Sequence, residues 1–171
     1  LHVRTAVLDA RCQQDRIDPG PIPKLWLIEL QLPAQELVPA ELVVRQAAAW
    51  DPLLDWSASH LKARLITAVG VMHTLQPEDG QAALAAAVWR HDPFELTGLY
   101  DLVALSGSLI IGLAVAEGHM TPDEAWATSR VDHVWQEDQW GVDDEAAAQA
   151  AYKADEFAQA ARLIGLARQP A

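Results

Sequence analysis

Cysteine is almost absent from this sequence of 171 residues, because Cys12 is the only one. A single cysteine cannot form an intramolecular disulfide, so a small secreted fold held together by disulfides is excluded. Basic residues are also few: 12 Lys and Arg stand against 24 Asp and Glu, which gives a net charge of −12. Binding to nucleic acid or to an anionic membrane surface needs clustered Lys and Arg, so we expect neither.

The sequence also has no apolar run of the length that a membrane span requires. Its longest apolar stretch, residues 102–116, is interrupted by Ser106, Gly107, Ser108 and Gly112. A transmembrane helix needs about 20 predominantly apolar residues. We therefore expect a buried core helix here and no membrane insertion.

Motifs for catalysis, metal binding or nucleotide binding are missing as well. There is no HExxH, CxxC, Walker, Rossmann or Gly-x-Ser-x-Gly pattern. No two histidines lie three or four residues apart, which is the spacing that places two ligands on one helix face. We expect no metal, no cofactor and no catalytic residue. The six histidines are His2, His60, His73, His91, His119 and His133.

From about residue 41 onward, capping residues mark the ends of successive helices. Residues 121–124 (Thr-Pro-Asp-Glu) combine an N-cap, a proline at the first helical position and a capping-box glutamate, and residues 92–95 repeat this arrangement. Gly141 suits the left-handed residue that follows a helix end. The predicted helices cover residues 41–50, 52–65, 77–90, 93–117, 122–140 and 143–168. The sequence thus predicts an all-α fold, a helical bundle around a central apolar helix at about 93–117.

The first 40 residues have a different character. Half of the ten prolines precede residue 40, and the run Asp18–Pro23 cannot be helical. Residues 25–32 alternate partly with a period of two and could form a strand. We expect residues 1–40 to be an irregular linker or the remnant of an N-terminal domain, and residues 41–171 to be a helical domain.

The most informative segment is residues 129–145, an amphipathic stretch that carries two tryptophans and many carboxylates. Helical spacing puts Ala127, Val131, Val134 and Trp135 on one apolar stripe, which we expect to face the core.

Polar residues fall on the opposite side of the same helix, facing away from the core. A merely solvated face explains such a stripe about equally often. A large aromatic at its end is typical of an interface anchor and favours a binding surface for another protein. The predicted partner-binding residues are Asp132, Gln136, Gln139 and Trp140.

Several motifs within residues 41–168 occur together and in a fixed order. They are Arg45–Trp56, Gly70–His73, Leu102–Leu109, Gly112–Ala114, Ser129–Asp132, Trp135–Gln136, Gln139–Gly141 and Asp143–Glu145. In these motifs the chain resembles the ATP12 family, the assembly chaperones of the F1 sector of ATP synthase, and mainly its C-terminal helical domain. The family's central glutamate and the apolar residue after its glutamine are replaced here by His133 and Glu137, and Asp132 keeps an acid at the centre.

The resemblance implies a chaperone that binds the free F1 α subunit and prevents its aggregation before assembly. It implies a bacterial cytoplasmic location, or the mitochondrial matrix if the source is eukaryotic. The family's β-rich N-terminal domain has no match in residues 1–40. A small helical enzyme with Asp132 and His133 as an acid–base pair is the alternative, but adjacent helical residues point about 100° apart.

Overall fold

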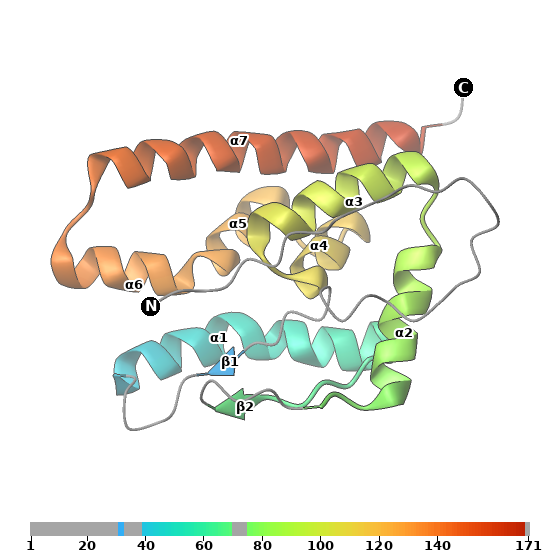
Figure 1. The fold of residues 1–171 in the computed structure, drawn as a ribbon, viewed down its shortest axis with the longest axis horizontal. Coiled ribbons are helices and arrows are strands. Elements are labelled where there is room, and N and C mark those ends of the chain that lie inside the picture. Colours follow the sequence, from blue (N-terminus) through green and yellow to red (C-terminus); the bar gives the residue numbers. More distant parts are fainter. Residues whose placement is uncertain (1–30, 33–38, 70–74, 170–171) are drawn as a thin grey trace.

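The structure is a computed structural model that describes residues 31–32, 39–69 and 75–169 (Figure 1). The all-α prediction is confirmed, since the only strands in these ranges are two residues long and pair in parallel. The segment predicted for residues 1–30 lies outside the described residues. The elements are β1 (Gln31–Leu32), α1 (Ala40–Trp56), a π-helical turn (Ser57–Leu61), β2 (Ala68–Val69), α2 (Glu78–Trp89), α3 (Pro93–Ser106), α4 (Leu109–Ala116), α5 (Pro122–Ser129), α6 (Val131–Trp140) and α7 (Asp144–Ala167).

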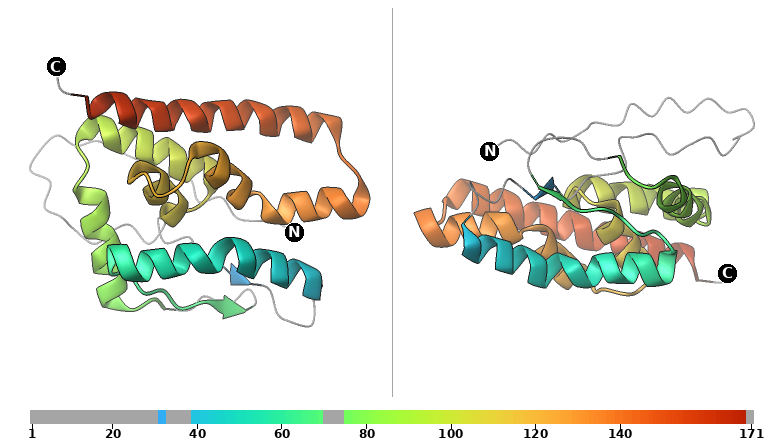
Figure 2. Two further views of the ribbon diagram at one scale, coloured as in Figure 1. Left: turned by 180° about the vertical axis from the view of Figure 1, so that it is seen from behind. Right: turned by 90° about the horizontal axis from the view of Figure 1, so that it is seen from below.

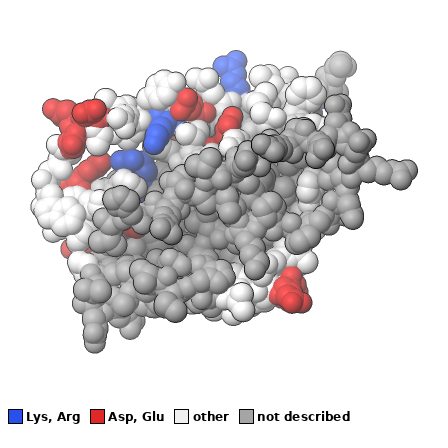
Figure 3. Space-filling view, viewed as in Figure 1, with Lys and Arg blue, Asp and Glu red and all other residues white. Residues whose placement is uncertain are grey.

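Helices α7 and α1 lie on opposite sides of a middle layer formed by α3, α4 and α5 (Figure 1 and Figure 2). Every residue of α4 is buried, so this short helix is the centre of the core. The second half of α7 packs against α3 through Ala160 and Ile164, and against α5 through Phe157. Acidic side chains gather over the end of the molecule where α6 leads into α7 (Figure 3).

The predicted central helix at 93–117 is wrong in one respect, because it consists of two helices that meet at a sharp turn. Gly107 ends α3 in the left-handed conformation, with a φ of 74°. Ser108 then caps α4 by accepting a hydrogen bond from the amide of Ile111. The Ser-Gly-Ser sequence is thus a C-cap followed by an N-cap.

A close contact between α3 and α4 follows from this turn. A Cβ atom on Gly112 would lie 2.8 Å from Cγ2 of Val103 and 3.3 Å from Cδ1 of Leu99. Glycine at this position therefore lets α4 fold back directly onto α3.

The predicted helix boundary at Asp51 and Pro52 is also wrong, because α1 continues through Pro52 to Trp56. Pro52 lacks the N–H group that would bond to the carbonyl of Ala48. Both residues are exposed, so water can satisfy that carbonyl. The helix ends one turn later in π-helical geometry, and Lys62 takes a left-handed conformation with a φ of 61°.

The predicted helix at 122–140 is likewise divided, into α5 and α6, by a kink at Arg130 with a φ of −108°. The predicted capping box at its start is confirmed, because Thr121 and Glu124 bond reciprocally. The hydroxyl of Ser129 bonds to the carbonyl of Trp126 at 2.7 Å, which takes up a carbonyl at the end of α5. The kink changes which side chains of α6 face inward.

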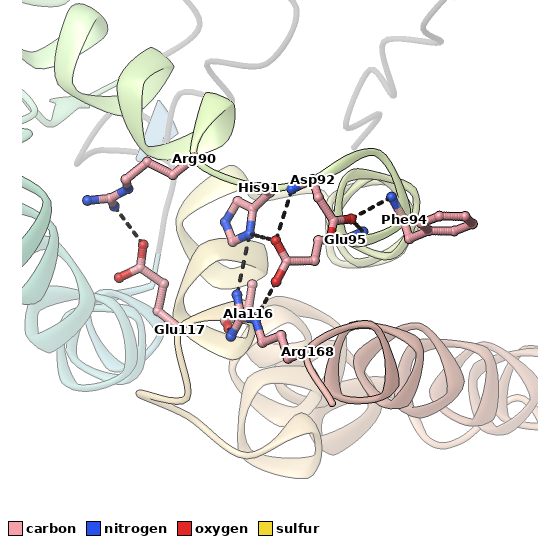
Figure 4. Close-up of polar contacts among 8 residues, drawn as sticks. All are labelled: Arg90, His91, Asp92, Phe94, Glu95, Ala116, Glu117 and Arg168. Carbon is pink, nitrogen blue, oxygen red and sulfur yellow. Dashed lines mark hydrogen bonds and ion pairs between the residues drawn. The ribbon is translucent and has the colours of Figure 1, made fainter. Parts of the chain in front are cut away.

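A polar cluster joins the start of α3 to the end of α7 (Figure 4). Arg168 donates hydrogen bonds to the carboxylate of Glu95 and to the carbonyl of Ala116. Glu95 also accepts a bond from the backbone of Asp92, which completes the predicted capping box. The hydrogen bond from Arg168 is the main cause that holds the pKa of Glu95 below its ordinary value, against the effect of its burial.

His91 completes this cluster, and its Nδ1 atom faces both an acceptor and a donor. Its Nδ1 atom lies 3.3 Å from Glu95 and 3.4 Å from Arg168, while Nε2 is buried and has no hydrogen-bond partner within the described ranges. With a proton on Nδ1, His91 can donate to the carboxylate of Glu95, and only the acceptor Nε2 is left unpaired. A proton on Nε2 would leave a buried donor unpaired. The guanidinium of Arg168 can only donate, so its contact requires the opposite state, an unprotonated Nδ1, and Nδ1 cannot bond to both partners at once.

The lowered pKa of Glu95 predicts a pH dependence of stability. Its contribution is fully present above the unfolded-state pKa of about 4.3 and is lost as the pH falls through the lower folded-state value. Glu95→Gln should therefore unfold at lower urea than the parent at pH 7, and this difference should shrink toward pH 3. Urea midpoints measured from pH 7 to pH 3 test this, with the exposed Glu145→Gln as the matched control. A constant difference at all pH values would contradict it.

Candidate partner-binding surface

Helix α6 is held against the first half of α1 by two polar contacts. Arg45 bonds to Asp138 at 2.6 Å and to Glu41, one turn back on α1, at 2.8 Å. These bonds to carboxylates raise the pKa of Arg45 above its ordinary value, first through Asp138. At the contact between α1 and α6, Nε2 of the buried Gln46 donates to Oδ1 of Asp132 at 2.8 Å. The two contacts fix the position of α6 relative to α1.

A second group of contacts holds the kink between α5 and α6. The indole N–H of Trp50 on α1 donates to the carbonyl of Thr128 at 3.0 Å. The guanidinium of Arg130 lies 5.8 Å from the ring centre of Trp126 and bonds to Glu137 at 3.1 Å. Arg130 is thus shared between the two helices, which gives the kink a defined shape.

The four predicted binding residues lie on α6, but they are not equivalent. Gln136, Gln139 and Trp140 are exposed, and 75% of Trp140 is accessible. The sequence predicts that Asp132 faces away from the core, whereas it is half-buried and accepts the bond from Gln46. One side of the predicted surface is therefore anchored to α1.

The predicted apolar stripe is only partly correct. Trp135 is buried as expected and meets Trp140 edge-on, with ring centres 5.7 Å apart. Val131 is half-buried, while Ala127 and Val134 are exposed. The kink at Arg130 explains this difference, because Ala127 and Val134 belong to separate helices and no longer share one stripe.

Two buried polar atoms at the seam of α1 and α6 have no hydrogen-bond partner among the residues described. They are Oε1 of Gln46 and Nε1 of Trp135. An unpaired buried donor or acceptor costs about 1–3 kcal/mol.

Sequence reasoning does not identify Arg45, Gln46 and Trp50 as part of this region. Glu41 and Arg45 do have the spacing of a helical ion pair, but that pattern says nothing of a partner on α6. Gln46 and Asp132 are 86 positions apart, and neither residue type is specific for the other.

Asp132 and His133, the acid–base pair of the alternative function, have different surroundings. Asp132 bonds to Gln46 while the adjacent His133 is exposed, so the two side chains do not share a site. Across residues 39–69 and 75–169, no group of three or more His, Cys, Asp or Glu side chains could hold a metal ion. No helix in the same ranges is both long and apolar enough to cross a membrane.

No protein-family profile matches the chain, but solved structures do. Atp12 from Paracoccus denitrificans matches with a TM-score of 0.74 and 44% identity, over 77% of this chain and 56% of that protein. An aspartate-to-lysine mutant of the same protein gives the same values. A candidate chaperone from Agrobacterium tumefaciens, the Atu1473 protein, matches with a TM-score of 0.70 and 41% identity, over 74% of this chain and 47% of its own.

The chain therefore spans about half the length of these proteins. Over most of its residues, the chain is similar to Atp12 both in fold and in sequence. Over the matched residues the chain has the fold of the ATP12 family.

Proposed function

We propose that this chain acts as an assembly chaperone of the F1 sector of ATP synthase and binds the free α subunit before it joins the β subunit. Its ATP12 fold and its likeness to Atp12 support this role, as does its likeness to a candidate chaperone. A chaperone of this kind needs a surface that covers an exposed subunit interface of its client, and it needs no chemical turnover.

The observation that carries this proposal is the exposed Trp140 at the end of α6. A tryptophan that is 75% exposed costs solvation free energy in the free protein. It becomes favourable when a partner covers it, and tryptophan is enriched among the residues that dominate binding energies. Gln136 and Gln139 supply hydrogen-bonding groups beside it. The result is an apolar anchor with a polar rim.

We expect Trp140→Ala to weaken binding of the free F1 α subunit by about 2 kcal/mol or more, which is roughly thirtyfold. Isothermal titration or a quantitative pull-down with isolated α subunit would measure this. Trp89→Ala is the matched control, because Trp89 on α2 is 42% exposed and lies outside α6. Equal effects of the two substitutions would argue against α6 as the binding surface.

The role of Asp132 can be separated from its structural bond. Asp132→Asn keeps an oxygen that accepts from Gln46, so the fold and most of the binding should be retained. Asp132→Lys removes that acceptor and adds repulsion toward a basic partner, so it should weaken binding more. Circular dichroism and thermal midpoints must accompany both variants, since a folded protein is required for the comparison. Normal binding by a folded Asp132→Lys, Trp140→Ala double variant would place the interface elsewhere.

A further inference from the structure

The first half of α7 does not take part in the core. None of its side chains from Asp144 to Glu156 is buried, and the first buried residue of the helix is Phe157. Figure 1 and Figure 2 show this half extending past α3 toward the turn that leads back to α6. Helices in proteins gain most of their stability from packing. Here, half of a long helix is maintained without burying any side chain among the described residues.

Large apolar side chains are exposed at the same end of the molecule. Trp140 and Val134 lie on α6, Val142 lies in the connecting turn and Tyr152 lies on the first half of α7. Val142 is 63% and Tyr152 66% exposed. Several exposed large apolar residues in one short stretch are typical of a protein-binding site. We call α6 together with the first half of α7 the α6–α7 surface.

The α6–α7 surface is also rich in carboxylates, which Figure 3 shows at this end of the molecule with basic side chains among them. Between residues 132 and 156 the sequence has eight Asp and Glu and only one Lys or Arg, Lys153. Within the described parts, Asp144, Glu145 and Asp155 form no ion pair. The pKa of nearby Asp101 on α3 is raised by its burial and further by the charge of Glu156. The negative charge of these carboxylates is therefore not neutralised by basic partners among the described residues.

Nε1 of Trp135 on α6 and Oε1 of Gln46 on α1 are both buried. One is a donor and the other an acceptor, and both are unpaired among the described residues. The apolar residues, the charge and these two atoms lie within two connected helices and their seam with α1.

From these features we infer that the α6–α7 surface docks a cationic, apolar segment of the partner, one in which Lys or Arg side chains stand beside aliphatic or aromatic ones. The basic groups match the unpaired carboxylates, and the apolar groups cover Trp140, Val142 and Tyr152. This inference rests on the proposed function, and it adds the first half of α7 and the chemistry of the bound segment.

Hydrogen exchange of the full chain, with and without isolated F1 α subunit, tests the location. Amides of residues 144–156 should exchange at least about tenfold more slowly in the complex, because this half of the helix opens locally when it is free. Amides of α7 beyond Phe157 are already protected by the core and should change little. Binding of the α subunit without any slowing at residues 144–156 would overturn this inference and leave the proposed function intact.

Substitutions test the chemistry of the segment. Tyr152→Ala should weaken α-subunit binding by about tenfold, whereas Tyr100→Ala on α3 serves as the matched aromatic control. Asp155→Lys should weaken binding about fivefold at low salt and less at high salt, whereas Asp51→Lys on α1, with the same change of charge, should not. Equal effects within either pair would overturn the inference. Complete failure of the parent chain to bind the α subunit would overturn both it and the proposed function.

Discussion

Phe157→Ala is expected to lower the free energy of unfolding by about 3–5 kcal/mol. Phe157 is 0% exposed and is the first side chain of α7 to enter the core. Its ring packs against Trp126 of α5, with ring centres 5.8 Å apart. Removing it leaves a cavity between two helices that cannot collapse without moving α7. Urea denaturation followed by circular dichroism would measure the loss.

Tyr152→Ala is the control for that experiment, because Tyr152 is an exposed aromatic on the same helix. Its substitution should change stability by less than about 0.5 kcal/mol. A loss below about 1 kcal/mol for Phe157→Ala would mean that α7 is not docked as described.

The second large effect is expected at Gly98, where α3 and α7 approach each other closely. A Cβ atom at this position would lie 2.9 Å from the carbonyl oxygen of Ala160 and 2.7 Å from Cγ1 of Ile164. A backbone oxygen cannot move aside as a flexible side chain can, so Gly98→Val should push the two helices apart. We expect a loss on the order of 3 kcal/mol, measured as a shift of the urea midpoint.

Gly165→Ala is expected to change the stability in the opposite direction and serves as the comparison. Gly165 lies near the end of α7, and a Cβ atom there meets nothing within 4 Å. Alanine should therefore stabilise the helix by about 0.4–1 kcal/mol. If both substitutions destabilised the protein alike, the close approach at Gly98 would not be the cause.

Local signals in the sequence are sufficient to locate most helix starts. The capping boxes at Asp92 and Thr121 form as predicted, and Asp143 caps α7 by accepting bonds from two backbone amides. Each of these contacts joins residues two or three positions apart, so the sequence itself contains both partners. For the same reason the all-α class and the order of most helices follow from local sequence patterns alone.

The predictions fail where tertiary packing decides between two local possibilities. Gly107 is compatible with the interior of a helix, but the fold of α4 back onto α3 favours its left-handed conformation. Pro52 is a suitable first residue of a helix, but the carbonyl it leaves unpaired is exposed to water, so α1 continues. Apolar periodicity cannot detect the kink at Arg130, because the residues on both sides are compatible with one helix.

The candidate surface is predictable as a segment but not as a set of contacts. Resemblance to the family leads to α6, and Trp140 is exposed there. The bond between Gln46 and Asp132 depends on how α1 lies across α6, which no spacing within either helix reveals. The unpacked half of α7 is not foreseeable either, because its alanine-rich sequence predicts a helix but not what the helix touches.

The pairing of α3 with α7 also leads to an expected order of folding. The bond between Glu95 and Arg168 joins residues 73 positions apart, so a long loop must close before it forms. The caps and the turn between α3 and α4 need no such closure and can form early. We therefore expect helix α7 to dock late during folding and to detach early during unfolding. Trp126, whose ring lies against Phe157, is placed to report that step by its fluorescence.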